Sequence, residues 1–213
     1  FAFGETLVEV ADAYPEIKFV ALDVADGEGG FHATENVFSA VYQEELSGYM
    51  AGYAAVKLGY KHLGYLGGMA VPAVQRFGYG CLQGVDAAAA ELNIAGDIKV
   101  EYVYGNQFFG DADITAVMDT WYGEKGVECV FACGGGIFTS AAEAAAKVGG
   151  KVIGVDVDQA PVIDGLYGEG LTVTSAMKGL APTVKTVLSA IVLEDNWAAY
   201  AGKIESLGLV SAD

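Results

Sequence analysis

Short apolar runs alternate with longer helix-like segments along most of the chain, and this alternation limits the fold more than any other feature. The apolar runs are far shorter than the roughly 20 residues of a membrane span, and they suit strands buried on both faces of a parallel sheet. Strands separated by helices predict βαβ units and an α/β fold. We expect strands at 17–24, 62–66, 98–104, 127–133, 151–155 and 171–175. We expect helices at 5–13, 44–58, 72–92, 111–122, 138–148 and 182–193.

The charge balance excludes one large class of partner. The net charge is −17, and Arg76 is the single arginine in the chain. A nucleic-acid-binding protein needs clustered basic residues to neutralise phosphates, and an anionic membrane surface needs them too. We therefore expect no nucleic-acid partner. Hydrophobic residues make up 53% of the chain, which is enough for a sizeable core.

The three cysteines are expected to be buried and chemically inert. Cys129 and Cys133 fall in one predicted strand, where four residues span about 13 Å. A disulfide needs Cα atoms within about 7 Å of each other. These two cysteines therefore cannot pair within a regular strand, and we predict no metal site.

The residues that follow the predicted strands carry the chemistry of a binding site. In an open parallel sheet, ligands bind beyond the carboxyl ends of the strands. Glycines let a ligand approach the backbone, and a phenylalanine offers a flat apolar face. A carboxylate accepts hydrogen bonds from hydroxyl groups, and an ammonium group donates to oxygen. The residues at these ends are Met69, Gly136, Phe138, Asp156 and Lys178, a set that suits a heteroaromatic ring carrying a sugar.

Each of these residues also has a purely structural interpretation. Glycines often form the turn into the next helix, and an aspartate often caps a turn. Phe138 could belong to the core, and Lys178 could be a solvated lysine at a helix start. Glu44 and Glu45 open a predicted helix, where negative charge favours the helix dipole, and they need no function on that interpretation.

Catalysis finds little support in the sequence. The chain contains no G-x-S-x-G, no phosphate-binding P-loop and no H-E-x-x-H motif. One alternative is an NAD-dependent dehydrogenase, since Gly134-x-Gly136 follows a predicted strand and Asp156 lies about 20 residues further on. The third glycine of that fingerprint is Thr139, and both histidines lie elsewhere. We therefore predict a binding protein without catalytic residues or a cofactor.

Five blocks in order along the chain resemble the basic membrane protein family. These are the PnrA-like, purine-nucleoside-binding lipoproteins of bacterial ABC transporters. The block at 152–159 is the most specific, because it is similar to the family's "IGVDxDQ". The blocks are Asn36-Val37 with Glu44-Glu45 and Gly48-Tyr-Met-Ala-Gly52; Gly64-Tyr-Leu-Gly-Gly-Met69 with Pro72, Arg76-Phe77, Gly80 and Gly84; Val130-Phe-Ala-Cys-Gly-Gly-Gly136 with Glu143-Ala-Ala145; Val152-Ile-Gly-Val-Asp-Val-Asp-Gln159; and Leu171-Thr-Val-Thr-Ser-Ala-Met-Lys178.

The resemblance implies a type I periplasmic-binding-protein fold, with two Rossmann-like lobes of parallel sheet flanked by helices, a hinge, and the ligand between the lobes. It implies that Phe138 stacks on the base while Asp156 and Lys178 hold the ribose. It also implies an extracytoplasmic protein with an ABC permease as partner and a lipid anchor outside this chain, and we expect a monomer. Ala70 stands where the family usually has Asp. A sugar- or autoinducer-binding protein of the same fold is the remaining alternative.

The expected division of the chain follows from that fold. Residues 1–60 are expected to form part of an incomplete first lobe, and residues 61–176 the second lobe. Residues 177–213 are expected to form a crossover helix and a return toward the first lobe. The opening Phe-Ala-Phe-Gly also fits the family.

Overall fold

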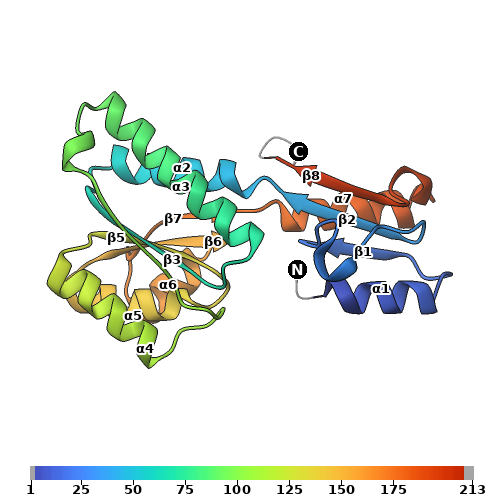
Figure 1. The fold of residues 1–213 in the computed structure, drawn as a ribbon, viewed down its shortest axis with the longest axis horizontal. Helices are drawn as coiled ribbons and strands as arrows, with labels where there is room; N and C mark the ends of the chain where they lie inside the picture. The colour runs from blue at the N-terminus through green and yellow to red at the C-terminus, as the bar shows by residue number, and fades with distance from the viewer. Residues whose placement is uncertain (1–2, 209–213) are drawn as a thin grey trace. The chain divides into compact units, whose positions relative to one another are not determined.

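The chain forms two compact units in a computed structural model that describes residues 3–208 (Figure 1). The first two residues of the opening Phe-Ala-Phe-Gly and the last five residues of the expected third segment lie outside that range. Unit 1 is Phe1–Gln43 with Gly179–Asp213, and unit 2 is Glu44–Lys178. The first boundary was expected at residue 60, whereas the second compact unit already begins at Glu44. The hinge between lobes stays a prediction.

Helices and parallel strands alternate as the sequence predicts. The strands are β1 (Phe19–Leu22), β2 (Val37–Tyr42), β3 (His62–Gly67), β4 (Lys99–Tyr104), β5 (Cys129–Cys133), β6 (Lys151–Asp156), β7 (Thr172–Met177) and β8 (Lys203–Leu207). The α-helices are α1 (Gly4–Ala13), α2 (Glu44–Lys57), α3 (Pro72–Glu91), α4 (Ala112–Asp119), α5 (Phe138–Val148), α6 (Ala160–Tyr167) and α7 (Leu180–Val192). Short turns are η1 (Glu28–Gly30), η2 (Ala95–Asp97), the π-helical η3 (Thr120–Lys125) and η4 (Trp197–Ala199).

Unit 2 is built around a five-stranded parallel sheet within the described residues, in the order β4-β3-β5-β6-β7. Helices α2 and α3 cover one face of this sheet, and α4, α5 and α6 cover the other (Figure 1). Successive side chains of a strand point to opposite faces. On β5, Cys129, Phe131 and Cys133 accordingly join the core under α2 and α3, while Val130 and Ala132 join the core under α4 and α5. This three-layer arrangement confirms the α/β prediction.

Helix α2 belongs to unit 2 because glycines let it pack directly on the backbone of α3. A Cβ atom added at Gly48 would overlap the carbonyl oxygen of Phe77, and one added at Gly52 would overlap that of Cys81. Small residues at this spacing allow two helix backbones to come close together. The close packing explains why the compact unit starts at the beginning of α2, not at its end.

Unit 1 is a smaller parallel sheet with a helix on each side. In the described part of the chain its strand order is β1-β2-β8. Ala11 of α1 packs with Phe31 and Val37 on one face, and Val187 of α7 packs with Phe38 and Ala40 on the other. Strand β8 therefore returns to this sheet from the far end of the chain.

Three elements were not predicted from the sequence. Strand β2, helix α6 and strand β8 all fall outside the expected strand and helix ranges. Helix α6 is only eight residues long and contains Gly165, a poor helix former, in its middle. Strand β8 mixes apolar and charged residues and pairs along only one edge, with β2. Such an edge strand carries no continuous apolar run.

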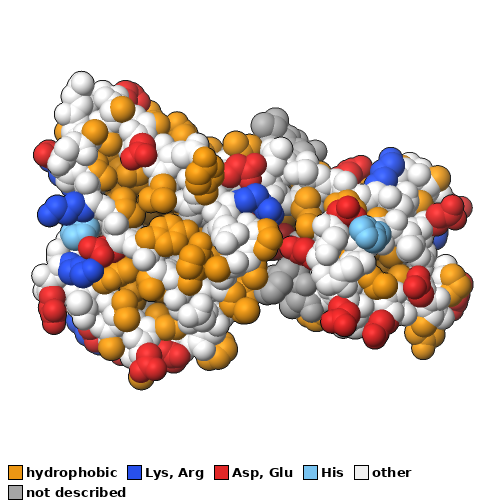
Figure 2. Space-filling model, in the orientation of Figure 1, with side chains coloured by type: hydrophobic (Ala, Val, Ile, Leu, Met, Phe, Trp, Pro, Cys, Tyr) orange, Lys and Arg blue, Asp and Glu red, His pale blue; other side chains and the backbone are white. Residues whose placement is uncertain are grey.

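The surface is acidic in places and apolar in others. Figure 2 shows hydrophobic side chains gathered on the visible face of unit 2, with acidic side chains scattered over both units. Among the helices of residues 3–208, none has the length and apolar character needed to cross a bilayer.

Candidate ligand-binding site

Four strand ends of the unit 2 sheet come together at one edge. The turn after β3 contacts the end of β5, because the Gly68 N–H donates to the Cys133 carbonyl at 2.8 Å. The ends of β6 and β7 are joined in the same way, because the Lys178 N–H donates to the Asp156 carbonyl at 2.9 Å. Strands β5 and β6 are neighbours, so the four ends form one continuous rim. This rim contains the turns that were predicted to bind a ligand.

Asp156 occupies a strained position at the end of β6. Its φ is +68°, in the left-handed region that residues other than glycine rarely adopt. The Val157 N–H donates to the Val155 carbonyl at 2.8 Å, which closes a three-residue γ-turn around Asp156. Strain of this kind is typical of functional sites, where the surrounding structure enforces it. The side chain is 36% exposed and is therefore accessible to a ligand.

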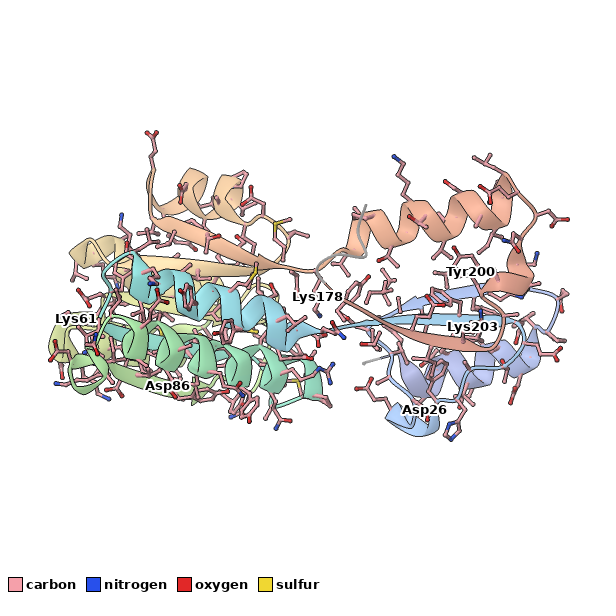
Figure 3. The ribbon with its side chains drawn as sticks, turned by 90° about the horizontal axis from the view of Figure 1, so that it is seen from above. Asp26, Lys61, Asp86, Lys178, Tyr200 and Lys203 are labelled. Atoms are coloured by element: carbon pink, nitrogen blue, oxygen red, sulfur yellow. The ribbon has the colours of Figure 1, made fainter. Side chains whose placement is uncertain are left out.

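Lys178 follows β7 and lies in contact with Asp156. Its Nζ is 3.5 Å from Asp156 Oδ1 and 3.5 Å from Glu44 Oε1. It also lies 5.6 Å from the centre of the Phe77 ring, within the range of a cation–π interaction. The Lys178 side chain is only 5% exposed. Figure 3 shows Lys178 where β7 ends, close to the beginning of α2.

Glu44 is a site residue that the sequence analysis missed. Its side chain is 1% exposed, and its Oε2 accepts a hydrogen bond from Arg76 Nε at 2.6 Å. Its other oxygen is the one that pairs with Lys178. We had interpreted Glu44 through the helix dipole alone, which does not require burial. The single arginine of a chain with a net charge of −17 was the signal that pointed to a buried acid.

The remaining predicted residues have different environments. Met69, in the turn after β3, is 40% exposed and accessible. Gly136 lies in the turn after β5 and is partly exposed. Phe138 is only 8% exposed and packs in the core under α4 and α5 with Leu66 and Ile114. Its ring packs in this core in the structure, and its predicted role in ligand binding stays a prediction.

Two other aromatic residues lie at this rim, in the turn after β4. Phe108 fills the space beside the glycine turns, since a Cβ added at Gly68 would lie 2.6 Å from its ring. Phe109 forms an isolated β-bridge with Gly136 and is 61% exposed. The exposed ring next to the glycine turn thus comes from a segment that the sequence analysis left without an assignment. Its signal was the Phe108-Phe109 pair between a strand and a helix cap.

The glycine turn after β5 does not fit a dinucleotide. A diphosphate bound at such a turn needs free backbone N–H groups. The Gly136 N–H instead donates to the Phe108 carbonyl at 2.8 Å, and the Ile137 N–H donates to the Gly134 carbonyl at 3.0 Å. A Cβ at Gly134 would lie 3.0 Å from both Gly68 Cα and the Phe108 ring. The protein's own backbone and Phe108 occupy the space that the dehydrogenase alternative requires.

Comparison with known proteins identifies the family. Residues 1–209 match the family model "ABC transporter substrate-binding protein PnrA-like". The chain is 27% identical to basic membrane protein B of Borreliella afzelii (strain PKo), covering 98% of this chain and 58% of that protein. It is 30% identical to the ABC transporter nucleoside-binding protein BmpA of Lactococcus lactis subsp. cremoris, covering 75% of this chain and 44% of that protein. The chain thus spans about half the length of these relatives.

Solved structures support the same fold. A solute-binding protein of an ABC transporter system from Aeropyrum pernix K1 gives a TM-score of 0.75 at 24% identity, covering 98% of this chain and 56% of that one. A periplasmic binding protein/LacI transcriptional regulator from Alkaliphilus metalliredigens gives 0.59 at 13% identity, covering 96% and 79%. These likenesses confirm the predicted type I periplasmic-binding-protein fold. The chain belongs to the PnrA-like family of ABC transporter substrate-binding proteins.

Proposed function

We propose that this chain is the ligand-binding part of an extracytoplasmic solute-binding protein that captures a purine nucleoside for ABC-type uptake and performs no chemistry on it. The proposal depends mainly on the Asp156–Lys178 pair at the carboxyl edge of the sheet. The name of the nucleoside-binding relative from Lactococcus lactis supports the ligand class. An ABC permease as partner, a monomeric state and a lipid anchor stay predictions.

Asp156 and Lys178 are suited to hold the two hydroxyl groups of a ribose. The partly exposed Asp156 carboxylate has oxygens to accept from both hydroxyls, and the Lys178 ammonium group can donate to an oxygen of the sugar. Hydrogen bonds to charged groups contribute about 1.5–3 kcal/mol each. The pair therefore offers enough energy to make a sugar the anchor of the ligand.

The charges around this pair favour a neutral guest. Lys178 and Arg76 carry two positive charges, and Glu44, Glu45 and Asp156 carry three negative charges in the same set of contacts. Glu44 engages both cations, so neither offers an uncompensated charge to a phosphate. A nucleoside should therefore bind in preference to its phosphorylated form.

We assign the base-stacking role to Phe109 in place of Phe138. Phe109 is exposed and is bridged to Gly136, whereas Phe138 is buried. Aromatic side chains stack favourably on flat apolar rings. Met69 and Gly136 would complete the apolar surroundings of the base.

A sugar without a base is the second candidate. The Asp156–Lys178 pair would suit the neighbouring hydroxyl groups of a free pentose equally well. The exposed Phe109 is the observation that favours a nucleoside, because a free pentose offers no flat aromatic ring to stack on it.

Calorimetry on the full-length protein tests the proposal. Guanosine, inosine, adenosine, the matching monophosphates and free ribose are titrated, and mass spectrometry identifies any ligand that co-purifies. Asp156→Asn should weaken nucleoside binding about 10- to 100-fold, because the carboxylate hydrogen bonds are lost. Asp158→Asn is the matched control, since Asp158 is exposed two residues further on. Absence of heat with every nucleoside, from a folded wild-type protein, would refute the proposal, and heat with ribose alone would favour the sugar.

A further inference from the structure

A gap between β5 and β6 is bridged by one glutamine side chain. Backbone pairing between the two strands ends at Phe131↔Ile153, before either strand reaches the rim. Beyond that point the side-chain amide of Gln159 replaces the missing backbone hydrogen bonds. Its Oε1 accepts from the Val155 N–H at 2.9 Å, and its Nε2 donates to the Gly135 carbonyl at 3.1 Å. The side chain thus connects the end of β6 to the glycine turn after β5.

Gln159 also contacts the third strand of this edge. Its backbone N–H donates to Ser175 Oγ on β7 at 3.1 Å. Gly154 on β6 provides the room for this arrangement, because a Cβ added there would lie 2.9 Å from both Gln159 Cβ and Gln159 Oε1. The spacing of Gly154, Asp156 and Gln159 in the sequence therefore has a structural reason.

The strained turn at Asp156 lies within this network. Strain in a left-handed residue persists only where neighbouring contacts enforce it. The Val155 N–H is bound by Gln159 and the Val155 carbonyl by the Val157 N–H. The Asp156 carbonyl accepts from the Lys178 N–H. Of these restraints, the bond from Gln159 is the one made by a side chain, so it can be removed by mutation.

We propose that Gln159 is a positioning residue, which fixes the Asp156 turn and the glycine turn at one separation so that the sugar and the base of a nucleoside are held together. This inference rests on the proposed function and adds a specificity-determining residue to it. Gln159 need not touch the ligand, since both ends of its amide are already used by the backbone.

Three substitutions in the full-length protein test this role. Gln159→Ala removes both side-chain bonds and should weaken nucleoside binding about tenfold or more. Gly154→Ala keeps Gln159 in the sequence, but its Cβ would lie 2.7 Å from Ser175 Oγ and 2.9 Å from Gln159 Oε1, so it should disturb the same network and have the same effect. Gln83→Ala, at an exposed glutamine of α3 in the same unit, is the control and should bind as the wild type does.

Gln159→Glu separates positioning from general stability through its pH profile. The introduced carboxylate keeps an acceptor for the Val155 N–H but loses the donor to the Gly135 carbonyl. Protonation near the usual glutamate pKa of about 4.3 restores a donor. The affinity of this variant relative to the wild type should therefore recover as the pH falls from 7 toward 4. A flat ratio across this range would overturn the proposal.

Hydrogen exchange without ligand makes the two hypotheses separable. In Gln159→Ala, amides of residues 134–136 and 155–157 should exchange faster than in Gln83→Ala, because a local opening costs less. Wild-type protein that binds no nucleoside would refute the proposed function, while the exchange comparison would still decide whether Gln159 holds the turns. Nucleoside binding by the wild type that is unchanged in Gln159→Ala and Gly154→Ala would refute the positioning role alone.

Discussion

Replacement of Glu44 by glutamine should destabilise unit 2 far more than expected for an acidic residue that only interacts with a helix dipole. The Glu44 carboxylate is 1% exposed, 2.6 Å from Arg76 Nε and 3.5 Å from Lys178 Nζ. The substitution preserves the shape of the side chain and removes only its charge. The nearly buried Lys178 then loses this carboxylate contact, while its contact with Asp156 stays in place.

The expected magnitude follows from the burial of the two partners. Removing one member of a fully buried ion pair costs about 3–5 kcal/mol. Arg76 is 38% exposed and recovers water contacts, and Lys178 keeps Asp156, so we expect about 2–3 kcal/mol for Glu44→Gln. For a chain of this length, each kcal/mol lowers the melting temperature by about 2–4 °C. The melting temperature should therefore fall by about 4–12 °C.

Glu45 provides the matched control. It opens the same helix and shares the same helix-dipole interaction, but its side chain is 41% exposed and lies 4.0 Å from Arg76. Glu45→Gln should change the free energy of unfolding by less than about 1 kcal/mol. Thermal unfolding followed by circular dichroism compares the two variants. Equal melting temperatures would show that Glu44 acts only through the dipole, as the sequence analysis first held.

Two further predictions concern packing and the thiols. Gly80→Ala should lower the melting temperature, because the new Cβ would overlap the carbonyl oxygen of Glu45 and push α3 away from α2. Gly96→Ala is its control, since nothing lies within 4 Å of the added Cβ, and an equal effect of both in thermal unfolding would contradict the packing argument. Burial raises the pKa of the Cys81 thiol to about 12 and raises the pKa values of the other two thiols as well. The folded protein should therefore not react with a thiol reagent at pH 8, whereas the denatured chain should react at all three cysteines; rapid labelling of the native state would disprove their burial.

The order of elements in unit 2 was predictable because its central strands are mostly apolar. Strands buried on both faces of a parallel sheet leave apolar runs such as Cys129–Cys133 in the sequence, and glycine and proline separate them. Unit 1 was harder to predict, because its sheet has two edges among only three strands in the described part. Strand β8 satisfies its backbone along β2 alone, so Lys203 and Glu205 are tolerated in it. Periodicity contains no information about such long-range pairing.

The candidate site was predictable where a residue follows directly from the end of a strand. Asp156 and Lys178 lie at the ends of β6 and β7, where strand direction places their backbones. The direction of the Phe138 side chain was not predictable, because a residue at the first position of a helix can face either the rim or the core, and helix α5 rotates it into the core. Glu44 and Phe109 come from segments whose place depends on tertiary packing.

Helix packing and the charges of the site are physically linked through α2 and α3. Glu44 opens α2 and Arg76 lies in the first turns of α3, so their 2.6 Å contact requires the two backbones to approach closely. The glycines at 48, 52, 80 and 84 permit that approach, because a Cβ at any of them would overlap backbone of the other helix. Without this close approach of α2 and α3, Glu44 could not hold Lys178 beside Asp156. The glycine spacing in these helices is therefore as much a requirement of the candidate site as of the core.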